Sequence, residues 1–234
     1  MSKNAKVEKI LSKTKYNFDD LCLIMEILRG EDGCPWDAEQ THESIRKNFI
    51  EETYEVIEAI DAKDSALLRE ELGDVLLQVV FHTQMENEAG NFNIDDVLHD
   101  VCAKLVHRHP HIFCDVVAST SDEVLSNWEA IKNVEKSRET MYDKLSSVPP
   151  MTPSLMRASK VAKKSGEFKE TSNSDIIAEI ENLLAVIKEN EENIGPENIG
   201  EILFLLGALS SKTNIDAEES LFKKTNSFIE KYRD

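Results

Sequence analysis

Apolar residues recur along this chain mostly at intervals of three and four, the spacing of helices that bury one face. Glycine and proline, which interrupt helices, number only 8 and 6 among 234 residues. The pattern predicts an all-α protein, a bundle with helices at about residues 17–29, 43–62, 65–89, 93–107, 121–139, 153–166, 173–190, 196–212 and 215–232.

A segment rich in proline and serine interrupts the helical pattern. It reads SSVPPMTP over residues 146–153, a composition typical of a linker. We therefore expect two domains, at residues 1–147 and 148–234.

The two predicted domains resemble each other. EELGDVLLQVVF (70–81) is similar to ENIGEILFLLGAL (197–209), and IEETYEVIEAI (50–60) aligns with AEIENLLAVI (178–187). We interpret this as a degenerate internal duplication of a helical unit. Two unrelated amphipathic helices remain the alternative.

The predicted helix over residues 43–62 carries carboxylates beside an apolar stripe. The stripe covers about half of the circumference and consists of Phe49, Ile50, Tyr54, Val56, Ile57 and Ile60. Glu52 and Glu55 lie three residues apart near one edge of it. Taken alone, this pattern is more typical of a solvated flank than of a site.

The next predicted helix, 65–89, makes a functional site more favourable than a solvated flank. Its apolar residues extend almost all the way round, which is typical of a buried helix. Glu71 and Asp74 lie three apart on one face of it, and burying uncompensated carboxylates is costly. Arg69 is a possible partner for one of them.

The short connection at residues 61–66 predicts that these two helices form an antiparallel hairpin. Glu52 and Glu55 would then meet Glu71 and Asp74. A set of oxygen donors without histidine or cysteine favours a hard cation, Mg²⁺ or Mn²⁺. A ferritin-like iron site would need E-x-x-H on such helices, and this spacing occurs only at residues 39–42, in a predicted loop.

The order of these acids resembles the MazG family of nucleoside triphosphate pyrophosphohydrolases. The similarity lies in E-E-x-x-E at 51–55, followed after fifteen residues by E-x-x-D at 71–74. Further similar segments are GCPWDAEQTHESI (33–45), GDVLLQVVFHTQM (73–85), KLVHRHPHIF (104–113), NWEAIKN (127–133) and LMRASKVAKK (155–164). The resemblance implies the all-α NTP pyrophosphatase bundle, completed by a homodimer. It also implies Mg²⁺-dependent hydrolysis of nucleoside triphosphates to a nucleoside monophosphate and pyrophosphate.

The family pattern implies roles for individual residues. Glu52, Glu55, Glu71 and Asp74 match its metal ligands. Lys104 and Arg108 match its K-x-x-x-R pair and would bind phosphate, although ordinary surface cations are the alternative. Asn48 would reach the sugar or base.

Other residues are candidates by position and chemistry. Glu51 is a candidate for orienting or deprotonating the attacking water, with Glu70 as its alternative; plain surface acids explain both about as well. Trp128 and Lys132 could supply a stacking face and a further cation, although a single tryptophan more often serves packing.

The second repeat departs from the ligand pattern. Its corresponding positions are Glu179, Asn182, Asn198 and Glu201, so two charged oxygen donors are missing. We expect this repeat to help assembly without hydrolysing nucleotides.

Charge and hydropathy limit the kinds of partner that we expect. A net charge of −18 disfavours binding to nucleic acid. No apolar run is long enough for a membrane span, the N-terminus lacks the apolar core of a signal peptide, and we expect a cytoplasmic protein. The four cysteines are expected to be reduced.

A zinc site at residues 107–114, HRHPHIFC, is not expected, since the spacing of its histidines and cysteine matches no common zinc motif.

Two other classes of protein remain open. One is a non-catalytic helical regulator that senses nucleotides, and the other is a carboxylate-bridged iron protein. Burial of acids favours an enzyme over a regulator, and a colourless protein would count against iron.

Overall fold

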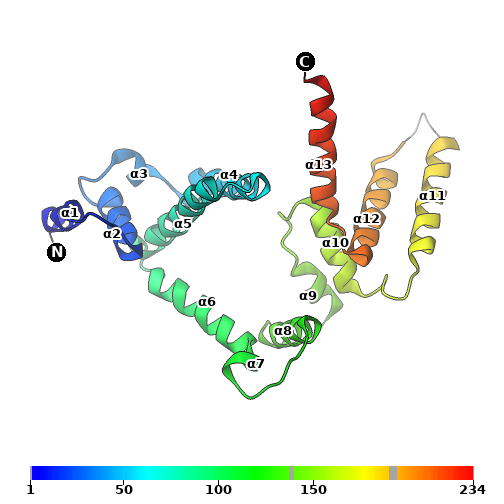
Figure 1. Ribbon diagram of the computed structural model, residues 1–234, viewed down its shortest axis with the longest axis horizontal. Coiled ribbons are helices and arrows are strands. Elements are labelled where there is room, and N and C mark those ends of the chain that lie inside the picture. The colour runs from blue at the N-terminus through cyan, green and yellow to red at the C-terminus, as the bar shows by residue number, and fades with distance from the viewer. Residues whose placement is uncertain (1, 137–139, 190–193, 234) are drawn as a thin grey trace. The chain divides into compact units, whose positions relative to one another are not determined.

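The computed structural model describes residues 2–136, 140–189 and 194–233, and within these ranges the chain forms thirteen α-helices, one short 3-10 helix and no strand. The prediction of an all-α protein is confirmed. The chain divides into two compact units, residues 1–117 and 118–234, which are coloured blue to green and green to red in Figure 1.

The first unit is built around one long helical hairpin. Its helices are α1 (Lys3–Leu11), α2 (Phe18–Arg29), α3 (Pro35–Glu39), α4 (His42–Ala62), α5 (Ser65–Glu88), α6 (Ile94–Arg108) and α7 (Pro110–Phe113). Helices α4 and α5 lie side by side in Figure 1. Lys63 ends α4 in the left-handed conformation, and the Asp64 carboxylate caps α5 by accepting hydrogen bonds from the backbone of Ala66 and Leu67. These caps make the reversal of the chain short, as the sequence predicted.

The core of the first unit lies where α2 and the first turn of α4 meet the second half of α5. It consists of Met25, Ile45, Val80, Phe81 and Met85, with Phe18, Leu21, Cys22 and Leu77 packed against it. Because the apolar contacts gather at this end of the hairpin, the other end of α4 and α5 receives little cover from α2.

Arg29 ties this core to the segment that leads into α4. Its guanidinium donates to the backbone oxygens of Asp37 and Gln40, at 2.5 and 3.2 Å, and to the Glu88 carboxylate at 2.8 Å. It also lies 5.3 Å from the ring centroid of Phe81. One buried cation therefore fixes α2, α3 and the end of α5 together.

The second unit repeats the theme of a helical hairpin. Its elements are α8 (Ser121–Glu135), α9 (Met141–Ser146), α10 (Ser154–Ser165), α11 (Asn173–Glu189), α12 (Pro196–Thr213), α13 (Ala217–Ile229) and η2 (Glu230–Tyr232). Helix α12 packs against α10 and α11 around the buried Ile176 and Leu205. A Cβ at Gly207 would lie 2.8 Å from that of Ala158, so the absence of a side chain lets α12 approach α10 closely.

The nine predicted helices correspond to α2, α4, α5, α6, α8, α10, α11, α12 and α13. The sequence analysis missed α1 and the short helices α3, α7 and α9. Residues 137–139 and 190, at the ends of two predicted helices, lie outside the described residues. The segment 146–153 falls inside the second unit, so the units divide about 30 residues before the predicted linker. The division into domains at residues 1–147 and 148–234 stays a prediction.

The expectation that α5 is buried on all sides is wrong for the single chain. Leu72 and Leu76 are 52% and 39% exposed. The reason is that α5 is covered by α4 along one side and by α2 only toward its C-terminal half, which leaves the outer side of its first half open.

No helix among the described residues is long and apolar enough to cross a membrane.

Replacing Arg29 by alanine should lower the free energy of unfolding by about 2–3 kcal/mol, because Glu88 would lose its cation and two backbone oxygens would lose a charged donor. Urea unfolding followed by circular dichroism measures the change. Arg46→Ala is the matched control, since Arg46 is exposed on α4 and forms no ion pair within the described ranges. Equal midpoints for the two variants would contradict the assigned role of Arg29.

Candidate metal centre

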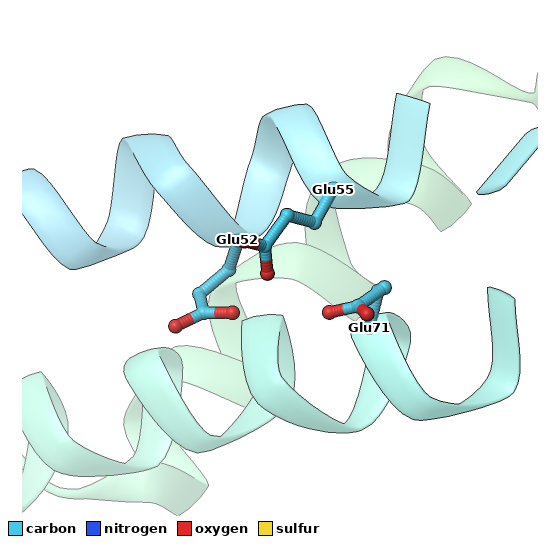
Figure 2. Close-up of side chains that lie close together, drawn as sticks. All are labelled: Glu52, Glu55 and Glu71. Carbon is cyan, nitrogen blue, oxygen red and sulfur yellow. The ribbon is translucent and has the colours of Figure 1, made fainter. Parts of the chain in front are cut away.

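The facing sides of α4 and α5 bring three carboxylates together. Glu52 and Glu55 extend from α4 toward α5, and Glu71 extends from α5 toward α4, as Figure 2 shows. One oxygen from each carboxylate lies within 4.8 Å of the other two. The i, i+3 spacing on α4 and the short reversal of the chain produce this convergence.

The carboxylate cluster, as we call Glu52, Glu55 and Glu71, is unevenly buried. Glu71 is 8% exposed, Glu52 is half-buried and Glu55 is exposed. The burial expected for the acids of α5 is therefore present at Glu71, whereas Glu55 on α4 reaches solvent. The reason is that the hairpin is only two helices wide here, so the α4 side of the cluster reaches solvent.

Asp74 lies beside the cluster rather than within it. It is half-buried one turn after Glu71. Its charge contributes to raising the pKa of both Glu52 and Glu71, so it is an electrostatic neighbour of each. Three of the four predicted ligands therefore converge, and the fourth is adjacent.

Burial and mutual repulsion shift the protonation of the cluster. Desolvation is the largest cause that raises the pKa of Glu52, followed by the charge of Asp74 and by the charge and hydrogen bond of Glu55. Desolvation likewise raises the pKa of Glu71, followed by the charge and hydrogen bond of Glu55 and the charge of Asp74. Negative charge here is unfavourable without a cation.

No lysine or arginine neutralises these acids among the residues that the structure describes. None of Glu52, Glu55, Glu71 and Asp74 forms an ion pair there, and Arg69, which the sequence offered as a partner, is exposed and forms none. A group of carboxylate oxygens without nitrogen or sulfur donors fits a hard divalent cation. The site can hold a metal ion.

Four residues of the apolar stripe of α4 are open to solvent, whereas Phe49 of the same stripe lies against His82 of α5. Ile50, Tyr54, Ile57 and Ile60 are 44–57% exposed, whereas Ala59, on the same side as Glu52 and Glu55, is fully buried. The hairpin thus holds acids on its inner side and presents apolar residues outside. Around the cluster this is the reverse of an ordinary amphipathic pair of helices, whose apolar residues lie inside.

The remaining acidic and amide candidates lie near the cluster. Glu51 and Glu70 are exposed, and their charges contribute to the raised pKa values of Glu52 and Glu71, respectively. Asn48 is half-buried one turn before Glu52. Their roles stay predictions.

The candidate phosphate-binding and base-stacking residues lie on other helices. Lys104 is exposed on α6, and Arg108, at the end of that helix, is only 6% exposed. Trp128 and Lys132 are half-buried on α8 in the second unit, where Lys132 lies 3.8 Å from Glu129. Binding of the substrate by these four residues stays a prediction.

Two other segments of the sequence are rich in potential metal ligands. Within the described ranges no group that includes His107, His109, His111 or Cys114 has its donor atoms close enough to hold a metal ion. The same is true of the acids of the second repeat, Glu179 on α11 and Glu201 on α12.

The sequence analysis missed a polar group at the other end of the hairpin. His42 Nδ1 lies 2.7 Å from His82 Nδ1, and His42 Nε2 lies 2.7 Å from Glu86 Oε1. The sequence HTQME (82–86) could have predicted this group, because its histidine and its last glutamate lie four residues apart on α5. It also missed Gln78, a buried amide between this group and the carboxylates.

The hairpin also matches known proteins. Residues 40–113 match the profile of the MazG nucleotide pyrophosphohydrolase domain. A nucleoside triphosphate pyrophosphohydrolase/pyrophosphatase MazG from Thermotoga maritima is 39% identical over 219 residues, which are 92% of this chain and 84% of that protein. The chain belongs to the MazG family. The family resemblance seen in the sequence is confirmed.

Two further relatives extend this result within the MazG family. A nucleoside triphosphate pyrophosphohydrolase from Escherichia coli K12 is 38% identical over 225 residues, which are 92% of this chain and 86% of that protein. YabN from Bacillus subtilis, whose function is uncharacterised, is 46% identical over 160 residues, 68% of this chain and 32% of YabN. The residues of the MazG domain match include all of α4 and α5.

Glu71→Gln should stabilise the metal-free protein at neutral pH. Because the pKa of Glu71 is raised above its usual 4.5, its contribution to stability is complete below pH 4.5 and is lost as pH rises through the raised value. In EDTA the variant should melt at a higher temperature than the wild type at pH 7.5, and the two should converge at pH 4. Differential scanning fluorimetry measures both.

The control for this experiment is Glu70→Gln, which removes one negative charge at an exposed neighbour. Addition of Mg²⁺ at pH 7.5 should stabilise the wild type more than Glu71→Gln. A Glu71→Gln protein that melts like Glu70→Gln at every pH would show that burial of Glu71 is not the source of the effect.

Proposed function

We propose that this protein hydrolyses nucleoside triphosphates to a nucleoside monophosphate and pyrophosphate, with Mg²⁺ as its cofactor. The observation that carries the proposal is the convergence of Glu52, Glu55 and Glu71 without a cationic partner. Membership of a family whose relatives are named nucleoside triphosphate pyrophosphohydrolases supports this reaction.

Glu52, Glu55, Glu71 and Asp74 would hold the metal. When bound, Mg²⁺ supplies positive charge against the phosphate oxygens and the leaving pyrophosphate, and Mn²⁺ is a plausible substitute. The chain's own acids cannot bind a triphosphate directly, since like charges repel. The raised pKa values of Glu52 and Glu71 support this assignment, because a cation would relieve the repulsion that causes them.

The other candidates have distinct tasks in this reaction. Glu51, or Glu70 on the opposite helix, would orient the attacking water and accept its proton. Lys104 and Arg108 would bind phosphate oxygens, and Trp128 and Lys132 would contact the base and phosphates. Asn48, one turn from Glu52, would reach the sugar or base.

We also propose a homodimer, which the exposed apolar residues of the hairpin support. Ile50, Tyr54 and Ile57 on α4 and Leu72 and Leu76 on α5 are each at least 39% exposed. Exposed side chains of this kind on neighbouring helices are typical of an interface between subunits. A second copy would cover them and complete the bundle.

The nucleotide-sensing regulator remains the second candidate, and turnover separates it from an enzyme. No observation favours it over the enzyme. The cytoplasm remains the proposed location, and nucleic acid is not a proposed partner because of the net charge of −18.

Glu71→Ala should reduce pyrophosphate release from nucleoside triphosphates at least a thousandfold, roughly 4 kcal/mol in the barrier. The physical reason is the loss of the most buried member of the carboxylate cluster. A coupled pyrophosphate assay with a panel of nucleoside triphosphates and Mg²⁺ measures it. Glu201→Ala, at the position of the second repeat that corresponds to Asp74, is the control and should retain activity within about threefold. Persistent turnover by Glu71→Ala would refute the assignment of the site to the first repeat.

Leu72→Glu should convert the dimer to a monomer, because an ionised carboxylate would be placed in the apolar interface. Light scattering after size exclusion should give a mass of 26.5 kDa for the variant and twice this mass for the wild type. Leu98→Glu, at an exposed leucine on α6, is the control and should remain dimeric. A monomeric wild type would end the dimer proposal.

A further inference from the structure

Gln78 is a buried amide with an unmet hydrogen bond. It lies on α5 and is 6% exposed. Its side-chain oxygen is sealed from solvent and has no hydrogen-bond partner among the described residues. Buried acceptors are nearly always paired in folded proteins, so an unpaired one calls for a donor that is absent from the isolated chain.

The position of Gln78 links it to the carboxylate cluster. It follows Asp74 by four residues and precedes His82 by four, so the three lie on one face of α5. Both neighbours face α4: the charge of Asp74 acts on Glu52, and His82 contacts His42 at 2.7 Å. Gln78 therefore lies on the inner side of the hairpin, between the cluster and the histidines.

Asn48 occupies the corresponding place on α4. It precedes Glu52 by four residues and follows the buried Ile45 by three, so it shares their face. Because α4 and α5 are antiparallel, with Glu55 near Glu71 and His42 near His82, Asn48 falls opposite Gln78. Asn48 is half-buried, and its side chain forms no hydrogen bond within the described ranges.

A matched glutamine on the same helix shows what a structural role looks like. Gln84 Nε2 donates to Glu88 Oε1 at 3.0 Å, within the group of contacts that Arg29 makes. Gln78 has no such partner. The contrast favours a ligand over a structural contact as the reason for the buried amide.

We propose that Gln78 is a substrate-binding residue that, together with Asn48, contacts the nucleoside of a nucleotide whose phosphates lie at the carboxylate cluster. This inference rests on the function proposed above. The two amides lie about one helical turn, ~6 Å, beyond the cluster. The sugar of a nucleotide follows its α-phosphate at a comparable distance.

The chemistry of the amides suits this task. Each carboxamide both donates and accepts hydrogen bonds, as the hydroxyls of a sugar and the edge of a base require. A glutamine side chain has three rotatable bonds, so its carboxamide can turn toward the cluster without movement of α5. The unmet oxygen of Gln78 would accept a hydrogen bond from an amino or hydroxyl group of the nucleoside.

The test replaces the amide by an apolar group of similar size, Gln78→Met, with Gln84→Met as the matched control. Steady-state kinetics with a panel of nucleoside triphosphates and Mg²⁺ should give a KM raised about tenfold, the effect of one hydrogen bond, and a kcat within twofold of wild type. Differences in kcat/KM between bases or sugars should shrink. Gln84→Met should change neither quantity by more than twofold. A purely structural role would not separate KM from kcat.

Binding gives an independent readout. Calorimetry with a nucleotide analogue that carries an α,β-imido bridge should show about tenfold weaker binding to Gln78→Met, while the affinity for Mn²⁺ alone stays unchanged. If Gln78→Met is insoluble, Gln78→Asn shortens the same amide and carries the same expectation. Analogue binding and KM equal to those of Gln84→Met would overturn the inference.

The outcomes separate the two proposals. A wild-type protein that binds the analogue but releases no pyrophosphate from any nucleotide would refute the proposed reaction, while weaker binding by Gln78→Met would still support this role for Gln78. A wild-type enzyme that turns over, with Gln78→Met equal to its control, would refute only the role of Gln78. A Gln78→Met protein with weakened Mn²⁺ binding would also overturn it, because the residue would then belong to the metal centre.

Discussion

Repulsion between carboxylates on the facing sides of α4 and α5 is the main constraint on the first unit. Glu52, Glu55 and Glu71 converge within 4.8 Å, and burial and mutual charge raise the pKa of Glu52 and Glu71. Such an arrangement weakens the metal-free fold at neutral pH. It persists because the Arg29 contacts and the core around Met25 and Phe81 hold the other end of the hairpin closed.

Around the carboxylate cluster the inner side of the hairpin is acidic and the outer side is apolar, whereas the other end of the hairpin keeps an apolar core. Acids, amides and histidines line the inner side, while Ile50, Tyr54 and Leu72 face outward. Buried acids are stable only beside a positive charge, and exposed apolar side chains are more stable when another apolar surface covers them. The proposed cation and nucleotide would serve the inner side, and the proposed second copy of the chain would cover the outer side.

Helical periodicity predicted nine of the helices and the hairpin, because long amphipathic segments with short connections leave few alternatives. It also predicted the approach of Glu71 to Glu52 and Glu55. It failed on α1 and on the short α3, whose order depends on tertiary contacts such as the backbone oxygen of Asp37 on Arg29. It also failed on the burial of Leu72, because an apolar run shows that a residue avoids water but not whether its own chain covers it.

The two repeats show why a shared fold does not imply a shared site. Helices α11 and α12 pack as a pair, as α4 and α5 do, yet asparagine replaces an acid at positions 182 and 198. With fewer like charges in contact, that hairpin needs no cation to remain closed. The sequence of the second repeat therefore predicts neither a metal site nor the destabilising repulsion that would accompany it. In the first repeat, burial and like charge make Glu52 and Glu71 unfavourable as carboxylates, and a cation bound between them would offset that cost.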